Sequence, residues 1–240
     1  MQTLVIVVVL LVLVAGGFYL FNRLRSTPEA ERARNVMRSR RQEDAPAVRE
    51  PTVSTLEPGD AVAFGDGTNA VVETVLECRE QVGPRTTAWR WSFLDDRKLL
   101  ESAPDGNVLY DRSEVAYQGG EMFQRLVAEA DQGGILKTFE QRVRAGTVAS
   151  EPLTFEHAGL TFHMRSTGTF TAVARGKPLD GVDVWQDVSP EAGDNVYFEA
   201  EARSGEQLLG VWTSHILLLV GQPLGITDID AIYPGAGGTA

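Results

Sequence analysis

Three histidines are the side chains of this sequence best suited to bind a metal ion. His157 and His163 would share the face of a strand if the chain did not bend at Gly159. With Glu156 or Asp228 they could offer two imidazoles and a carboxylate, a ligand set found in metal-dependent hydrolases. Ordinary surface or edge histidines are the simpler interpretation, so we predict no metal site.

Nucleophilic catalysis needs a base and an orienting group near the nucleophile, and the sequence supplies neither locally. Cys78 is the only cysteine and lies beside Arg79 in a strand-like run, which favours a buried, inert thiol. Ser214 and His215 are adjacent, so on a strand they would point to opposite faces. No glycine-rich phosphate loop follows a predicted strand and opens a helix.

Paired carboxylates are the remaining candidates for acid–base chemistry, which requires burial to separate two pKa values. The pairs are Asp95 with Asp96, Asp183 with Asp187, and Asp228 with Asp230. Each pair has turn-like or polar neighbours, which is typical of a solvated surface. We therefore predict that the protein is not an enzyme and needs no cofactor.

An aromatic stripe is the strongest binding candidate. In the alternating segment 86–94, Trp89, Trp91 and Phe93 share one face, while Arg90 points to the other. The stripe is either core, because each large ring can bury about 150–250 Å², or the floor of a hydrophobic groove for a partner segment. In the second case Trp89, Arg90 and Trp91 would contact the ligand or partner.

The elements that position these residues are mostly strands. Short alternating or β-branched runs separated by turns occupy residues 58–117 and 153–233, with a hairpin signal at Ser204-Gly205-Glu206. One short helix is predicted within 119–134, and the segment 135–146 is compatible with either strand or helix. We predict a mainly β fold over residues 55–240, an antiparallel sandwich or barrel-like domain or two small β lobes.

The first 22 residues contain no charged side chain and are long enough, at about 1.5 Å per residue, to cross a bilayer as a helix. No Lys or Arg precedes them, and many Arg follow, so the positive-inside rule places the C-terminal side in the cytoplasm. The prediction is a single-pass membrane protein with its N-terminus outside. A signal peptide cleaved near Ala15-Gly16-Gly17 is the alternative, although a basic n-region is missing.

Residues 23–54 read as an Arg-rich juxtamembrane linker, either a solvated helix or tether or a strip that binds lipid headgroups. Between positions 23 and 49 it has eight Arg against four acidic residues, a net charge of +4. The arginines predicted to face lipid headgroups are Arg23, Arg25, Arg32, Arg34, Arg38, Arg40 and Arg41. From Glu50 onward there are 14 basic and 29 acidic residues, a net charge of −15, which argues against a nucleic acid partner.

The order of these blocks resembles the bacterial family catalogued as domain of unknown function 4178. The resemblance covers about residues 56–235 and rests on "LEPGDAVAF", "TAWRWSFLDD", "KLLES", "GDNVYFEAEARSGEQLLGVWTSH" and the closing "GITDIDAIYPG". It implies no reaction, but it implies a membrane-associated context and a polyamine-related neighbourhood. The acidic residue that the family often has before its late Trp is missing, because Gly210-Val211 precede Trp212 here.

Three functions follow as hypotheses. The first is a membrane-tethered, non-enzymatic adaptor whose acidic domain docks a protein partner at the inner leaflet. The second is a binding domain for a small cationic ligand such as a polyamine, which the net charge of −15 favours. The third, more remote, is a metal-dependent hydrolase that uses the histidines.

Overall fold

A computed structural model of the chain describes residues 50–117, 119–148, 150, 152–177, 185, 188, 195–213, 215–225 and 227–235. The predicted membrane segment 1–22 lies outside these residues, as does nearly all of the linker with its seven predicted headgroup-binding arginines. Within the described ranges, no helix has both the length and the apolar character needed to cross a membrane.

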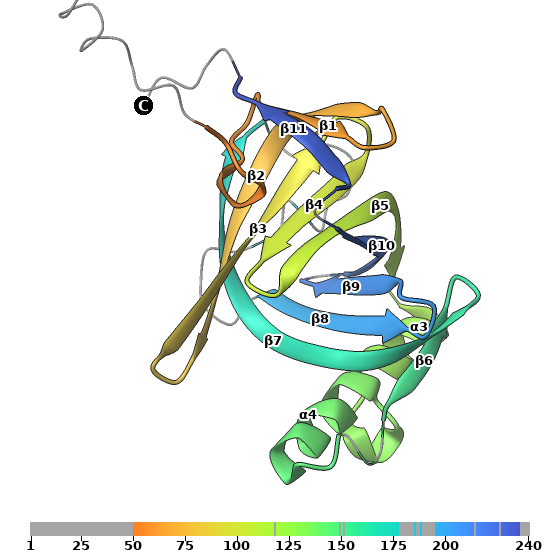
Figure 1. Cartoon of the computed structure of the whole chain (residues 1–240). Coiled ribbons are helices and arrows are strands. Elements are labelled where there is room, and N and C mark those ends of the chain that lie inside the picture. The colour runs from red at the N-terminus through yellow and green to blue at the C-terminus, as the bar shows by residue number, and fades with distance from the viewer. Residues whose placement is uncertain are drawn as a thin grey trace, which may run out of the picture. The chain divides into compact units, whose positions relative to one another are not determined.

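Eight antiparallel strands form a closed barrel (Figure 1). Around the barrel they follow the order β2, β3, β4, β5, β10, β9, β8 and β7, and β7 pairs back onto β2. Their bounds are β2 Asn69–Val82, β3 Arg85–Leu94, β4 Lys98–Ala103, β5 Gly106–Tyr117, β7 Leu160–Gly176, β8 Asn195–Ala202, β9 Gln207–Trp212 and β10 Ile216–Leu224. Closure gives each of these eight strands a partner on both sides, and the ends of the complete sheet are formed by β11 and β6.

Shorter elements cover the outside of this barrel. Strands β1 (Ala61–Phe64) and β11 (Ile229–Tyr233) extend the sheet beyond β2, and β6 (Thr154–His157) extends it beyond β7. Between β5 and β6 lie α3 (Gly120–Val127), the 3-10 turn η2 (Ala130–Gln132) and α4 (Ile135–Ala145). A second 3-10 turn, η1 (Val53–Thr55), precedes β1. Figure 1 shows α4 below the strongly curved β7.

The barrel interior is filled by a column of aromatic rings. Trp185 contacts Phe93 and Trp91, with ring centroids 4.9 and 5.8 Å apart. The Phe170 ring lies 5.2 Å from Trp91, and the Trp89 ring lies 5.7 Å from Phe170. The Tyr197 ring ends the column, 5.2 Å from Trp89. An eight-stranded barrel is just wide enough for its own side chains to fill, so the middle of this one is a packed core.

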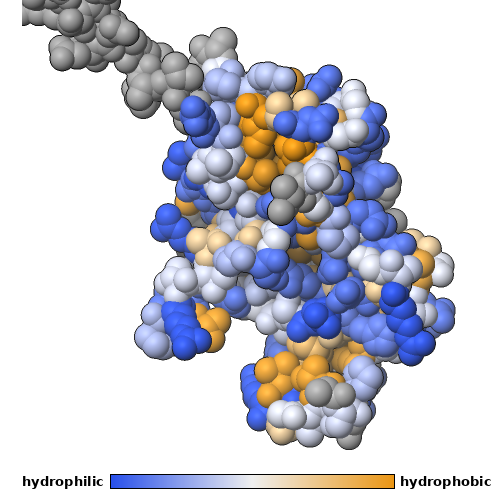
Figure 2. Space-filling view, in the orientation of Figure 1, coloured by the Kyte–Doolittle hydropathy of each residue, from blue (hydrophilic) through white to orange (hydrophobic). Residues whose placement is uncertain are grey.

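Two further apolar clusters lie on the outer face of the wall. One is packed under the helices and β6 and includes Phe139, Phe162 and Phe198. The other is packed under β1, β11 and η1 and includes Phe64 and Leu100. Figure 2 shows a largely hydrophilic surface, with apolar side chains gathered at the β1–β11 end and at the helices.

The structure confirms a mainly β chain and specifies its form as one closed barrel, not a sandwich or two lobes. The predicted helix within 119–134 is confirmed as α3. The ambiguous segment forms the second helix, α4, because Ile135, Leu136 and Phe139 recur at helical spacing and are all buried. The Ser204-Gly205-Glu206 hairpin connects β8 to β9 as expected.

Candidate functional site

One mouth of the barrel holds a cavity of about 210 Å³ with an acidic lining. Strands β4, β5, β7, β8, β9 and β10 and the β4–β5 turn contribute to it. The ionisable residues of the lining are Glu101, Asp105, Tyr110, Arg165, Glu199 and Glu201. Four carboxylates therefore face one arginine among the described residues that line the cavity. We call this cavity the acidic mouth.

Glu101 is the most deeply buried of the four carboxylates, with 4 % of its surface exposed. It lies on β4 directly opposite Trp91 of β3, so both side chains point into the barrel. Burial raises the pKa of the Glu101 carboxyl to about 8, and the nearby Glu199 carboxylate adds to this rise. The Tyr110 hydroxyl donates a hydrogen bond to Glu101 and opposes the rise.

Trp91 places a second donor beside the Glu101 carboxyl. Its indole ring is fully buried, and its Nε1 has no hydrogen-bond partner of acceptable geometry. The N–H is nevertheless close enough to Glu101 to favour the charged carboxylate. A buried donor without a well-formed hydrogen bond is uncommon in folded proteins, and this one lies beside Glu101.

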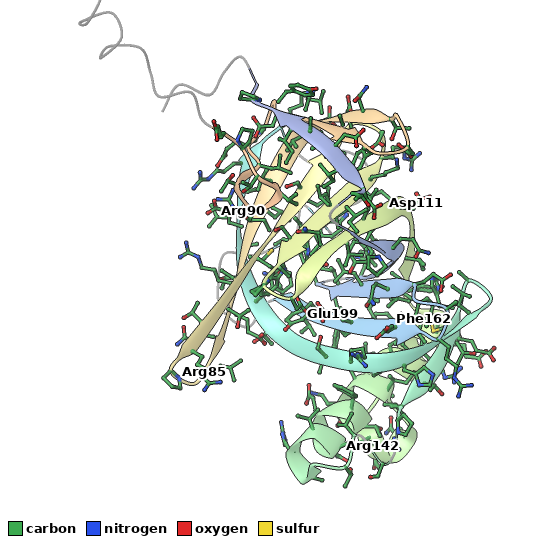
Figure 3. All side chains as sticks on the ribbon, viewed as in Figure 1. Arg85, Arg90, Asp111, Arg142, Phe162 and Glu199 are labelled. Atoms are coloured by element: carbon green, nitrogen blue, oxygen red, sulfur yellow. The ribbon has the colours of Figure 1, made fainter. Side chains whose placement is uncertain are left out.

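Glu199 and Glu201 reach the mouth from β8, two residues apart and therefore on the same face of the strand. Figure 3 labels Glu199 on this strand. Burial raises the pKa of Glu199, although the Ser166 hydroxyl donates to its Oε2 at 2.5 Å. Glu201 forms an ion pair with Arg165, whose Nε lies 3.4 Å from Oε2 and whose side chain is 65 % exposed.

Beside the mouth, a fifth carboxylate holds the β2–β3 hairpin to the barrel. Backbone pairing between β2 and β7 ends at Arg79 and Thr171, one residue before Glu80. The Glu80 side chain then crosses to the other strands and accepts a hydrogen bond from the Tyr197 hydroxyl at 2.8 Å. Gly168 on β7 makes room, because a Cβ there would lie 1.9 Å from Glu80 Oε1.

The predicted binding residues Trp89, Arg90 and Trp91 divide between two environments. Both indoles point inward, and Trp89 and Trp91 are 7 % and 0 % exposed, which places them in the barrel core. Arg90 points outward and forms ion pairs with Glu77 at 2.6 Å and Glu57 at 3.6 Å. Trp89 and Arg90 do line a second hollow, of about 500 Å³, beside β3.

Neither the described histidines nor the cysteine line the acidic mouth, although His163 of β7 lies directly opposite Glu201 of β8. His157 and His163 are on the neighbouring strands β6 and β7, and among the described residues no group of three His, Cys, Asp or Glu could hold a metal ion. His157 packs against Tyr117, and burial lowers its pKa. Cys78 is buried in the barrel interior, where burial and then Glu101 raise the pKa of its thiol, so it stays protonated and unreactive.

Of the predicted carboxylate pairs, Asp95, Asp96 and Asp228 lie at turns, and Asp230 lies on β11. Asp95 accepts a hydrogen bond from the backbone of Val71 at 2.8 Å, and Asp96 pairs with Lys98 at 2.9 Å. Asp228 accepts from the backbone of Gly225 at 2.6 Å. Asp183, Asp187 and Ser214 lie outside the described residues.

Sequence reasoning missed all four carboxylates of the acidic mouth. In "NVYFEAEARS", Glu199 and Glu201 alternate with Ala200 and Ala202, a pattern that normally places the acids in water. Here the alanines face the apolar cluster beneath the helices and the acids face the barrel interior. The only signal was a strand-like run before Glu101, where "KLLES" puts an acid directly after two leucines.

No family model, no curated protein and no solved structure matches this chain. The resemblance to the family of domain of unknown function 4178 therefore stays a prediction. The described part of the chain belongs, by its fold, to the closed eight-stranded antiparallel barrels. It has an acidic mouth and an outer layer of two helices.

Proposed function

We propose that the protein is a membrane-tethered, non-enzymatic binding module that takes a small cationic ligand into its acidic mouth. The tether is the apolar segment 1–22, and the barrel lies on the cytoplasmic side of the membrane. The single observation that carries the ligand proposal is Glu101, a carboxyl that is 4 % exposed and lines a cavity of about 210 Å³. Burying a carboxyl is costly unless a partner offsets the cost.

The balance of charge at the mouth supports a cation. Glu101, Asp105 and Glu199 form no ion pair with any described side chain, and the only cationic lining residue, Arg165, is paired with Glu201. A bound cation would supply the missing positive charge where the low local dielectric strengthens attraction. The described carboxylates do not form a metal-binding group, which favours an organic cation with several N–H donors.

The adaptor hypothesis, in which Trp89 and Trp91 dock a protein partner, has less support. Trp91 is fully buried, and Trp89 reaches the hollow beside β3 with only 7 % of its surface exposed, so the two indoles offer little contact area to a partner segment. The cavity and its carboxylates are therefore the better basis for a function.

Isothermal titration calorimetry of the full-length chain in a non-ionic detergent tests the proposal, with spermidine as the probe cation. We expect saturable binding at low ionic strength that weakens as salt is added. A triple variant, Glu101→Gln with Asp105→Asn and Glu199→Gln, should lose this binding. Its control, Glu121→Gln with Glu129→Gln and Glu140→Gln, removes the same charge from the helical region and should bind normally. Absence of heat for the wild type from pH 6 to 9 would refute the proposal.

A further inference from the structure

We propose that the acidic mouth exchanges a proton for its cation: Glu101 carries a proton in the empty cavity, and the arriving cation displaces it. The inference rests on the proposed function, because it describes how the same cavity binds. In the step itself, the O–H bond of the Glu101 carboxyl breaks, the proton passes to solvent, and the carboxylate pairs with the cation. No electrons are transferred and no covalent bond to the ligand is formed.

The position of Glu101 at the inner end of the mouth is the first argument. Its side chain is almost completely removed from water, so an ionised carboxylate there would lack hydration. The donors beside it are the Tyr110 hydroxyl and the Trp91 indole N–H, both neutral groups. Neutral donors alone do not offset the cost of burying a full charge, so the site without a cation favours the protonated carboxyl.

The charged neighbours of Glu101 are the second argument. The titratable groups that face it or influence it are Cys78 of β2, Asp105 of the β4–β5 turn, Tyr110 of β5, Arg165 of β7, and Tyr197, Glu199 and Glu201 of β8. The only cation among them, Arg165, is at the exposed rim and bound to Glu201. Repulsion from Glu199 and Asp105 therefore adds to the cost of ionising Glu101.

The unpartnered indole of Trp91 is the third argument. A protonated carboxyl gives up one oxygen to its own O–H, whereas a carboxylate can accept hydrogen bonds at both oxygens. Trp91 Nε1 lies next to Glu101 without a hydrogen bond of acceptable geometry. The ionised carboxylate could accept hydrogen bonds from both Tyr110 and Trp91. Two donors are therefore in place for the ionised state of Glu101, which is the state that pairs with a bound cation.

The size of the effect follows from the titration of Glu101. With a pKa of about 8, Glu101 is mostly protonated at neutral pH, and burial also keeps the pKa of Glu199 raised. A cation that requires the carboxylate must remove the proton, so its apparent affinity falls by roughly tenfold for each unit of pH below 8. The barrel would then hold its ligand in neutral or alkaline surroundings and release it on acidification.

Calorimetry in two buffers tests the exchange directly. Spermidine is titrated into the full-length wild-type protein at pH 7 in phosphate and in Tris, which have different heats of ionisation. The alkyl ammonium groups of the probe remain protonated at this pH, so a difference in heat reports protons released by the protein. We expect release of close to one proton for each ligand bound, and an apparent affinity that rises roughly tenfold from pH 6 to pH 7.

The variants separate this inference from the proposed function. Glu101→Gln should bind more weakly and show the same heat in both buffers, whereas Glu140→Gln should match the wild type. Wild-type binding with identical heat in both buffers would overturn the exchange and leave the cation site intact, while no binding at any pH would refute the site itself. Independently of any variant, infrared difference spectra of the wild type should show loss of a protonated carboxyl C=O band when ligand is added, and an unchanged band would also overturn the exchange.

Discussion

At the scale of single residues, the acidic mouth depends on a few side chains that break the usual rule of apolar inside and polar outside. Glu101, Glu199 and Glu201 occupy inward positions next to residues such as Leu99 and Leu209 of the barrel core. Such positions cost stability, because a buried carboxyl loses its hydration. Substitutions here should therefore separate folding from binding.

The first prediction concerns stability and Glu101. In the unfolded chain its carboxyl titrates near 4.5, whereas in the folded barrel its pKa is about 8. Between these values the folded state holds a proton that the unfolded state has lost, so this group lowers stability as pH rises, by up to about 1.4 kcal/mol per pH unit. Glu101→Gln should abolish this slope and be more stable than the wild type at pH 8. Urea unfolding of the wild type and the variant from pH 4 to 9 measures the pH dependence and the difference in stability. The same pH dependence of the unfolding free energy in both proteins would contradict the prediction.

A second prediction concerns Arg165, the built-in cation at the rim of the mouth. Because its guanidinium neutralises Glu201 and repels an arriving cation, Arg165→Gln should tighten binding of spermidine by a few-fold. The effect is modest because the side chain is 65 % exposed and screened by solvent. Arg142→Gln on α4, labelled in Figure 3 and distant from the mouth, is the control and should leave the affinity unchanged. Weaker binding in the Arg165 variant would contradict this role.

These residues also show where the sequence was informative and where it was not. The stripe of Trp89, Trp91 and Phe93 was correctly placed on one face of a strand, with core as one of its two interpretations. The inward direction of Glu199 could not be predicted, because alternation gives two faces without saying which one is covered. In β8 both faces are covered, one by the barrel interior and one by the cluster beneath the helices.

At the scale of elements, the β2–β3 hairpin is held to the barrel by the Glu80 contact described above. We expect Gly168→Ala to destabilise the protein by about 1–3 kcal/mol, since the added methyl group meets the Glu80 carboxylate and the Tyr197 ring. The same substitution in a Glu80→Ala background should cost less, because one of the two clashing groups is gone. Chemical unfolding of the four proteins of this cycle provides the measurement. Equal costs in both backgrounds would show that Glu80 does not hold the hairpin.

The helix α4 contributes by covering the outer wall. Phe139 is buried between α4 and the barrel, so Phe139→Ala should cost about 3–5 kcal/mol. Val143 on the same helix is 54 % exposed, and Val143→Ala should change stability by less than about 0.5 kcal/mol. Thermal or urea unfolding distinguishes the two. Similar small losses for both variants would mean that α4 is only loosely packed.

The helix pair also shows the limit of periodicity. Segment 135–146 was compatible with strand or helix, because short apolar runs fit both periods. Its helical form depends on a tertiary surface, the outer faces of β7 and β8, which bury Ile135, Leu136 and Phe139. Local propensity alone could not provide that information.

At the scale of the whole molecule, the strands and several turns followed from the sequence, while the closure of the barrel did not. Closure depends on the pairing of β2 with β7, in which Thr74 lies opposite Gly176 and Arg79 opposite Thr171. Partners so far apart in the chain leave no local signal, so a sandwich and a barrel have the same sequence pattern. The acidic mouth exists only because the sheet closes, which explains why its residues could not be grouped in advance.

The last prediction concerns the side of the membrane on which the barrel lies. Residues 1–22 carry no charge, and the net charge changes from +4 in the linker to −15 beyond it, so moving the Arg-rich linker across a bilayer would be unfavourable. In a Cys78→Ala background, which removes the single buried thiol, Ser26→Cys should resist a membrane-impermeant thiol reagent in intact cells and react after lysis. Thr3→Cys, on the other side of the apolar segment, should react in intact cells and serves as the control. Labelling of Ser26→Cys in intact cells would reverse the orientation and expose the acidic mouth to the outside, where its cation and its proton would come from a different compartment.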